Sequence, residues 1–244
     1  MKRRVALITG ATGGIGEAIT RRFSKDGYDL VLHYHRNDEK AKSLQKALKK
    51  KDQKILLLKG ELSDVATLEN MLEKIKEHGL DIDVLINNAG IKIDKPIEKM
   101  EDQDFKEVMR INVDGPWMLM KRIVPMMRAK GHGRIINITS GVAKDGNLNQ
   151  TNYGASKAAL ENITKSLARE VGKDGITVNC VAPGLIETPM TKDVDEARKK
   201  DYIKRVPIGR LVKSEDVAVA CAFFALEETA AISGQILGVN GGLR

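Results

Sequence analysis

The sequence predicts an α/β fold: a single domain, residues 1–244, built on a doubly wound parallel sheet of about seven strands with helices on both faces. Strand-like and helix-like segments alternate from the first residues to about Ala182, which is the pattern of βαβ units. A glycine-rich turn, Gly10 to Gly16, joins the first strand to the first helix. A chain of 244 residues with 42% apolar and 30% charged residues suits one such domain.

The elements of the first half can be assigned in order. The first strand covers 5–9, and the helix after it starts at the glycines. Its apolar residues Ile15, Ile19 and Phe23 recur at helical spacing until Gly27. The segments that follow are predicted as a strand at 30–34, a helix at 39–50, a strand at 55–59, a helix at 65–78 and a strand at 84–87.

The second half continues the alternation and then departs from it. A long helical stretch with an irregular middle covers 102–128. The segment 185–211 is polar and charge-rich and carries Pro189 and Pro207, so we interpret it as a lid over a substrate. The other predicted segments are a strand at 134–138, a helix at 152–173, a strand at 177–182 that Pro183–Gly184 ends, a helix at 214–226 and a strand at 235–239. Right-handed crossovers would place all strand carboxyl ends on one edge, where such sheets bind ligands.

The net charge of +8 raises the question of nucleic-acid binding. The densest basic cluster, at 46–54, has no interleaved aromatic residue for base stacking, so we expect it to finish an exposed helix. We therefore predict no nucleic-acid partner. The surplus charge is better suited to acidic partners, such as a phosphorylated cofactor or an acidic carrier protein.

Metal and membrane sites are not predicted either. Cys180 and Cys221 lie far apart without a metal-ligand pattern, and His33 and His35 lack a third ligand. The apolar run at 217–226 is too short to span a bilayer, and no signal-peptide core follows the basic N-terminus. We expect a cytoplasmic protein with no membrane association.

The glycine-rich turn is suited to a dinucleotide. Gly10, Gly13, Gly14 and Gly16 do not have the spacing G-x-G-x-x-G, but backbone without Cβ atoms can approach a pyrophosphate closely. The helix that begins there directs its free N–H groups and positive dipole end toward the phosphates. A tight turn that binds nothing is the alternative.

The end of the second strand bears on which dinucleotide is bound. Binders that prefer NAD usually carry an acidic residue there for the ribose hydroxyls. No carboxylate precedes Asp38, whereas the Arg36 guanidinium could pair with a 2′-phosphate. We predict that the cofactor is NADP(H). The alternative is that Arg36 is merely a solvated loop residue.

A tyrosine and a lysine form the candidate catalytic pair. Tyr153 and Lys157 are four residues apart and share one face of the predicted helix. A nearby ammonium group favours the phenolate, so we expect the pKa of Tyr153 to lie below its ordinary value of about 10. Tyr153 could then exchange a proton with an alcohol or carbonyl, while the Ser140 hydroxyl steadies the same oxygen.

Along its whole length, the chain resembles the short-chain dehydrogenase/reductase superfamily. The glycine pattern of that family is met by Thr9, Gly10, Gly14 and Gly16, and its Asn-Asn-Ala-Gly motif by 87–90. The resemblance implies the catalytic set Asn112, Ser140, Tyr153 and Lys157, and a Pro-Gly motif at Pro183–Gly184. It implies a Rossmann-type fold and these cofactor contacts: Gly10, Thr12, Gly14, Ile15, Gly16, Arg36, Glu61, Leu62, Asn88, Ala89, Gly90, Tyr153, Lys157, Pro183, Gly184, Ile186 and Thr188.

Within that superfamily, the chain is most similar to bacterial β-ketoacyl-acyl-carrier-protein reductases. The similarity lies in 149–153 before the tyrosine, in 166–170 on the same helix, in Gly90-Ile91 with Asp94, and in 235–242. It implies NADPH-dependent reduction of a 3-oxoacyl thioester on acyl carrier protein in fatty-acid biosynthesis, by a homotetramer. Two alternatives remain open: a related reductase or dehydrogenase acting on an acyl-CoA, a steroid, a sugar or another small alcohol or ketone, and an NADP(H)-binding regulator without turnover.

Overall fold

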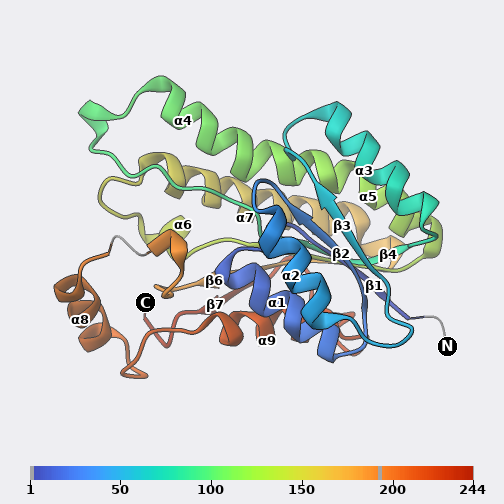
Figure 1. Cartoon of the computed structure of the whole chain (residues 1–244). Helices are drawn as coiled ribbons and strands as arrows, with labels where there is room; N and C mark the ends of the chain where they lie inside the picture. The colour runs from blue at the N-terminus through green and yellow to red at the C-terminus, as the bar shows by residue number, and fades with distance from the viewer. Residues whose placement is uncertain (1–2, 192–193, 244) are drawn as a thin grey trace.

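The computed structural model describes residues 3–191 and 194–243. This part of the chain forms one seven-stranded sheet in the order β3-β2-β1-β4-β5-β6-β7, with every neighbouring pair parallel. Helices cover both faces, so the molecule has three layers (Figure 1). The predicted doubly wound parallel sheet is therefore confirmed.

The strands are short, and the five inner ones are almost wholly buried, as a sheet covered on both faces requires, whereas the edge strands β3 and β7 are partly exposed. Their bounds are β1 Val5–Ile8, β2 Asp29–Tyr34, β3 Ile55–Lys59, β4 Ile82–Asn87, β5 Gly133–Ile138, β6 Ile176–Pro183 and β7 Ile236–Val239. The first strand ends one residue earlier than predicted. Thr9 turns its hydroxyl into the next loop instead, where it accepts hydrogen bonds from the backbone N–H groups of Asn88 and Ala89.

Two layers of helices bury two separate cores against the sheet. On one side α1 (Gly14–Lys25), α2 (Asp38–Leu48) and α9 (Ser214–Phe224) share a core that includes Phe23, Leu44 and Phe224. On the other side α3 (Val65–Glu77), α5 (Gly115–Lys130) and α7 (Thr151–Val171) enclose Leu68, Ile123 and Leu160. Figure 1 shows these groups above and below the sheet.

The predicted irregular middle of the long helical stretch is confirmed. The stretch consists of α4 (Asp102–Met109), five residues of π-helix at Arg110–Asp114, and α5. A π-helical turn inside an α-helix is rare and is found mostly at functional sites. It contains Asn112, which is fully buried.

The segment predicted as a lid contains a helix that was not predicted, α8 (Glu196–Arg205). Its N-cap is Asp195, whose side chain accepts a hydrogen bond from the Arg198 backbone N–H at 2.7 Å. With the short helix α6 (Val142–Asp145), α8 lies at one end of the molecule, on the left in Figure 1. The predicted lid residues 192–193 lie outside the described residues.

Candidate active site

The site lies where the strand order reverses, between β1 and β4. From β1 the order runs outward to β2 and β3 on one side, and to β4 and beyond on the other. Connections leave the carboxyl ends of β1 and β4 in opposite directions there, which opens a crevice in sheets of this type. Hydrogen bonds join the loop after β1 to the loop after β4 across the crevice. The side-chain amide nitrogen of Asn88 donates to the carbonyl oxygens of Thr9 and Gly10 at 2.9 and 3.1 Å.

The glycine-rich turn has room for backbone and for little else. Gly10 has φ +63°, and a Cβ atom on it would lie 2.9 Å from Ala89 Cα. A Cβ on Gly16 would lie 2.1 Å from the Gly10 carbonyl oxygen. The N-cap of α1, Gly13, provides no side chain to cap the first turn of the helix. Together these features make a backbone cradle at a helix N-terminus, which fits the pyrophosphate of a dinucleotide.

His33 contacts the backbone of this cradle. The sequence did not indicate this role. His33 Nδ1 lies 3.4 Å from the Gly10 backbone nitrogen, and its Nε2 lies 3.0 Å from the Gly60 carbonyl oxygen. Burial lowers the pKa of His33 to about 4. The ring is therefore neutral, accepting from Gly10 and donating to Gly60, and it joins the loops after β1 and β3.

The segment after β6 is brought to the same turn. A Cβ atom on Gly14 would lie 2.9 Å from Thr188 Cγ2, so the first turn of α1 and Thr188 are in direct contact. Pro183 ends β6, and the Gly184 N–H donates to the Val239 carbonyl oxygen at 3.0 Å. The predicted contacts Gly14, Gly184 and Thr188, distant in sequence, thus lie along one edge.

The predicted contacts for the adenosine end gather after β2 and β3. Glu61 lies between two basic residues, with His35 Nε2 at 3.9 Å and an Arg110 guanidinium nitrogen at 3.8 Å. Leu62 is buried against Gly115. Arg36 follows β2, is exposed, and forms no ion pair within the described residues. Its guanidinium is available to an anionic ligand.

The remaining predicted contacts lie on the glycine-rich turn, on the loop after β4 and on the segment after β6. Thr12 and Ile15 are half-buried, at the turn and in the first turn of α1. Gly90 separates two catalytic candidates: a Cβ atom there would lie 3.0 Å from Asn112 Oδ1 and 3.4 Å from Lys157 Nζ. Ile186 is buried and forms an isolated parallel bridge with Val212.

Tyr153 and Lys157 lie on the same face of α7, as predicted. Lys157 Nζ is 5.7 Å from the centre of the Tyr153 ring. The Lys157 side chain is buried, and Nζ donates a hydrogen bond to the Ile138 carbonyl oxygen at 2.9 Å. Ser140 follows β5, and its interaction with the Tyr153 hydroxyl favours the phenolate. The geometry therefore brings Ser140, Tyr153 and Lys157 together.

The expectation that Lys157 lowers the pKa of Tyr153 is wrong for this structure. Burial raises the pKa of Tyr153 to about 12; the Ser140 hydrogen bond opposes this shift and the charge on Asp94 adds to it. Burial likewise lowers the pKa of Lys157 to about 8. Desolvation outweighs the proximity of the two groups, because each is removed from water and the ammonium is bonded to a carbonyl oxygen instead of the phenol oxygen.

Asn112 is held by three hydrogen bonds. Its Oδ1 accepts from the Ile91 N–H at 2.8 Å, and its Nδ2 donates to the Ile91 carbonyl oxygen at 2.9 Å and to Ser156 Oγ at 3.0 Å. Ser156 donates in turn to the Tyr153 carbonyl oxygen at 2.7 Å. Asn112 therefore ties the loop after β4 to the helix that carries the candidate catalytic pair. Ser156 was missed by the sequence argument, and its only signal was its place one residue before Lys157.

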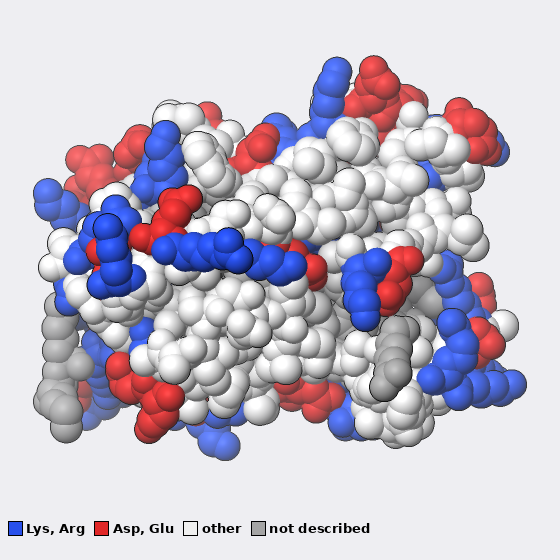
Figure 2. All heavy atoms as spheres, turned by 180° about the vertical axis from the view of Figure 1, so that it is seen from behind, with Lys and Arg blue, Asp and Glu red and all other residues white. Residues whose placement is uncertain are grey.

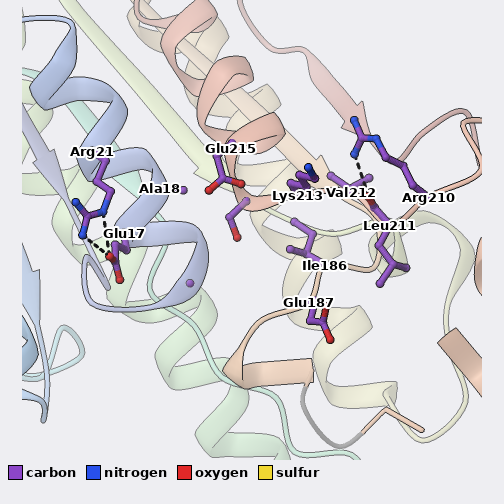
Figure 3. A pocket seen from close by; sticks show the side chains of 12 residues that line it. Glu17, Ala18, Arg21, Ile186, Glu187, Arg210, Leu211, Val212, Lys213 and Glu215 are labelled. Atoms are coloured by element: carbon purple, nitrogen blue, oxygen red, sulfur yellow. Dashed lines mark hydrogen bonds and ion pairs between the residues drawn. The ribbon is translucent and has the colours of Figure 1, made fainter. Parts of the chain in front are cut away.

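A pocket of about 510 Å³ lies beside this edge, between α1 and the base of the lid segment (Figure 3). It reaches two predicted cofactor contacts, Gly14 and Ile186, but none of the four predicted catalytic residues lines it. Its charged side chains are of both signs and partly pair with neighbours, as Arg21 does with Glu17 at 2.8 Å. We therefore place the chemistry at the strand ends and not in this pocket.

Two further searches covered the described residues only. Within 3–191 and 194–243, no three His, Cys, Asp or Glu side chains gather as they would around a metal ion. In the same ranges, every helix is too short or too polar to cross a membrane.

Comparison with known proteins gives matches over the whole chain. A family model described as Enoyl-(Acyl carrier protein) reductase matches residues 10–244. The 3-oxoacyl-(acyl-carrier-protein) reductase FabG of Haemophilus influenzae is 40% identical over 243 residues, which are 100% of this chain and 99% of that protein. Its namesake from Escherichia coli K12 is 39% identical, with coverage of 98% and 97%. Nodulation protein G of Rhizobium sp. strain N33 is 42% identical, with coverage of 98% and 96%.

Proposed function

Because this chain belongs to the short-chain dehydrogenase/reductase family, we propose that it is the oxidoreductase that converts a 3-oxoacyl thioester on acyl carrier protein into the 3-hydroxyacyl thioester in fatty-acid biosynthesis. The observation that carries the proposal is the meeting of Ser140, Tyr153 and Lys157 at the strand edge that also holds the glycine cradle. A ketone reduction needs a proton donor at that edge, and these side chains provide one.

Tyr153 is the proposed acid. With a pKa of about 12 it is protonated at neutral pH, so it can give its proton to the oxygen of a ketone as negative charge develops there. Ser140 donates a hydrogen bond to the same oxygen, a contact that strengthens in the transition state. Lys157 supplies a positive charge close to the Tyr153 ring. Asn112 holds the backbone of Ile91 beside the pair.

NADPH is the proposed cofactor, and when bound it supplies the hydride. The backbone of Gly10, Gly14 and Gly16 would hold its pyrophosphate, and the Arg36 guanidinium its 2′-phosphate. The other proposed contacts are those named from the sequence, at 12, 15, 61–62, 88–90, 153, 157, 183–184, 186 and 188. The cradle fits the pyrophosphate of either dinucleotide, while the exposed Arg36 and the absence of a carboxylate in β2 after Asp29 support NADPH over NADH.

The rest of the proposal concerns organisation. Residues 1–244 act as one NADP(H)-binding domain, in which 185–211 is the substrate lid, and the enzyme works in the cytoplasm. Four chains assemble into a homotetramer. Exposed apolar side chains support this assembly, among them Trp117 on α5 and Phe223 on α9. The face seen in Figure 2 has wide areas without charged side chains above and below a row of mainly Lys and Arg side chains, and such areas suit a subunit interface.

An assay with three thioesters tests the proposal. The purified chain is given NADPH with acetoacetyl-carrier protein, acetoacetyl-CoA or crotonyl-carrier protein, and nicotinamide absorbance is followed. The crotonyl substrate is included because the matching family model is described as an enoyl reductase. We expect oxidation of NADPH with acetoacetyl-carrier protein as the best substrate.

Each other result favours a different function. Preference for acetoacetyl-CoA favours a reductase of acyl-CoA, and turnover of the crotonyl substrate alone would overturn the assignment of Tyr153 as acid to a ketone oxygen. NADPH binding without turnover of any of the three favours a regulator or a reductase of a ketone that is not a thioester.

A further inference from the structure

A tyrosine of the lid helix is bonded to the end of β6. The Tyr202 hydroxyl oxygen accepts a hydrogen bond from the Leu185 backbone N–H at 2.9 Å. Tyr202 lies on α8, and Leu185 directly follows Pro183–Gly184. This bond joins the middle of the lid helix to the strand end that carries the proposed cofactor contacts.

Gly184 provides the space for that hydroxyl. A Cβ atom on Gly184 would lie 2.5 Å from Tyr202 Oη and 3.2 Å from Asn240 Cα. A side chain here would displace either the tyrosine or the segment after β7. The lid helix and the ends of β6 and β7 therefore meet at one glycine.

The base of the lid is anchored at its two ends, where Ile186 and Val212 belong to the buried core shared with α1 and α9. Ile186 and Val212 form a parallel bridge at its two ends, and the Ile208 N–H donates to the Gly241 carbonyl oxygen at 3.2 Å. Beside the bridge lies the pocket of about 510 Å³ shown in Figure 3, which Ile186 and Val212 line together with Gly14 and Ala18 of α1. α8 also contacts the segment after β6 through Lys199 Nζ and Glu187 Oε1 at 3.1 Å, and an Arg198 guanidinium nitrogen lies 3.4 Å from Asn147 Oδ1.

We propose that Tyr202 is a positioning residue, whose hydroxyl fixes α8 over the strand end so that the lid forms one wall of the acyl-binding site. A hydroxyl that accepts from a backbone N–H sets both the distance and the orientation of the helix. Without it, α8 can lift from Leu185. Only the kinetic part of this inference rests on the proposed function.

The test is Tyr202→Phe, which removes one oxygen atom and keeps the ring. The matched control is Tyr28→Phe, because the Tyr28 hydroxyl donates to the Ala225 carbonyl oxygen at 3.5 Å, away from the lid. In Tyr202→Phe, we expect amide exchange in a peptide that covers Leu185 to be about fivefold faster, which corresponds to the loss of one hydrogen bond. Trypsin cleavage within α8, at its lysines and arginines, should rise in parallel, while the control matches the wild type in both.

Kinetics give the second readout. We expect Tyr202→Phe to raise KM for the 3-oxoacyl thioester by about fivefold, as one lost hydrogen bond implies, with kcat and the Kd for NADPH within about twofold of wild type. Unchanged exchange at Leu185 and unchanged cleavage of α8 would overturn the inference, as would faster exchange throughout the sheet together with a lower thermal midpoint. If the wild type reduces none of the thioesters, the proposed function fails, whereas exchange and cleavage still decide the role of Tyr202.

Discussion

Lys157 lies beside the ring of Tyr153, with Nζ 5.7 Å from the ring centre, but it donates its hydrogen bond to the Ile138 carbonyl oxygen and not to the phenol. The pair is therefore close enough for the charge to act on the ring, while both groups keep the pKa values that burial imposes. Three consequences of this arrangement can be measured.

Replacing Tyr153 by Phe should remove the proton donor and leave the fold intact. We expect the rate of ketone reduction to fall by a factor of about 100 to 10,000, the usual contribution of a general acid. The Kd for NADPH, from nicotinamide fluorescence, should change little because the ring stays. Near wild-type turnover by a folded Tyr153→Phe protein would disprove the role of this tyrosine.

Replacing Lys157 by Met should make the protein more stable and inactive. In the native state burial lowers the pKa of Lys157 to about 8, from its ordinary value near 10.5 when unfolded. Below pH 8 both states are protonated, and the native state bears the full cost of a buried charge. We expect Lys157→Met to raise the free energy of unfolding at pH 7 by about 2 to 3 kcal/mol in urea titrations without cofactor.

The same pair of proteins gives a pH test of that explanation. Between pH 8 and about 10.5 the unfolded lysine binds a proton that the native lysine does not, so wild-type stability should rise with pH in this window. The stability advantage of Lys157→Met should therefore shrink across the window and vanish above it. An advantage that is constant with pH would mean that packing, and not charge, is responsible.

Replacing Gly16 by Ala should damage the cradle, because its Cβ would lie 2.1 Å from the Gly10 carbonyl oxygen. We expect unfolding free energy to fall by about 1 to 3 kcal/mol, as for other overpacked sites, and NADPH binding to weaken at least about tenfold. Gly13→Ala is the control, since its Cβ would come only within 3.3 Å of the same oxygen. Equal effects of the two changes would contradict this account of the turn.

Replacing Arg36 by Ala should weaken the binding of NADPH much more than the binding of NADH. Loss of a charge-assisted contact to the 2′-phosphate should raise the Kd for NADPH about 10- to 100-fold, with little change for NADH. Lys49→Ala, at the exposed C-cap of α2, removes the same charge away from the crevice and should leave both constants unchanged. A parallel loss of affinity for NADH would argue against contact with the 2′-phosphate.

Two elements show where prediction from the sequence failed and why. The strand predicted at 84–87 begins at Ile82, because Asp83 is paired inside the sheet: it accepts from the Val5 N–H at 2.7 Å and from Lys130 at 2.8 Å. In the sequence, the charged Asp83 interrupts the apolar run, so the strand was predicted to begin after it. In the structure, its hydrogen-bond partners allow it to lie within the strand. In the lid, Asp195 was a readable capping signal for α8, but the polar composition around it gave no apolar stripe to mark a helix.

The sequence by itself determined the order of the seven strands and of the long helices along the chain, the glycine cradle and the set of four catalytic candidates, because each depends on residues close together or on a recognisable motif. Only the tertiary structure decided that burial governs the pKa values of Tyr153 and Lys157, that Asn112 lies in a π-helical turn bonded to Ile91, and that Tyr202 reaches Leu185. Desolvation and long-range hydrogen bonds depend on which distant segments are packed around a group, and residue spacing along the chain does not contain that information.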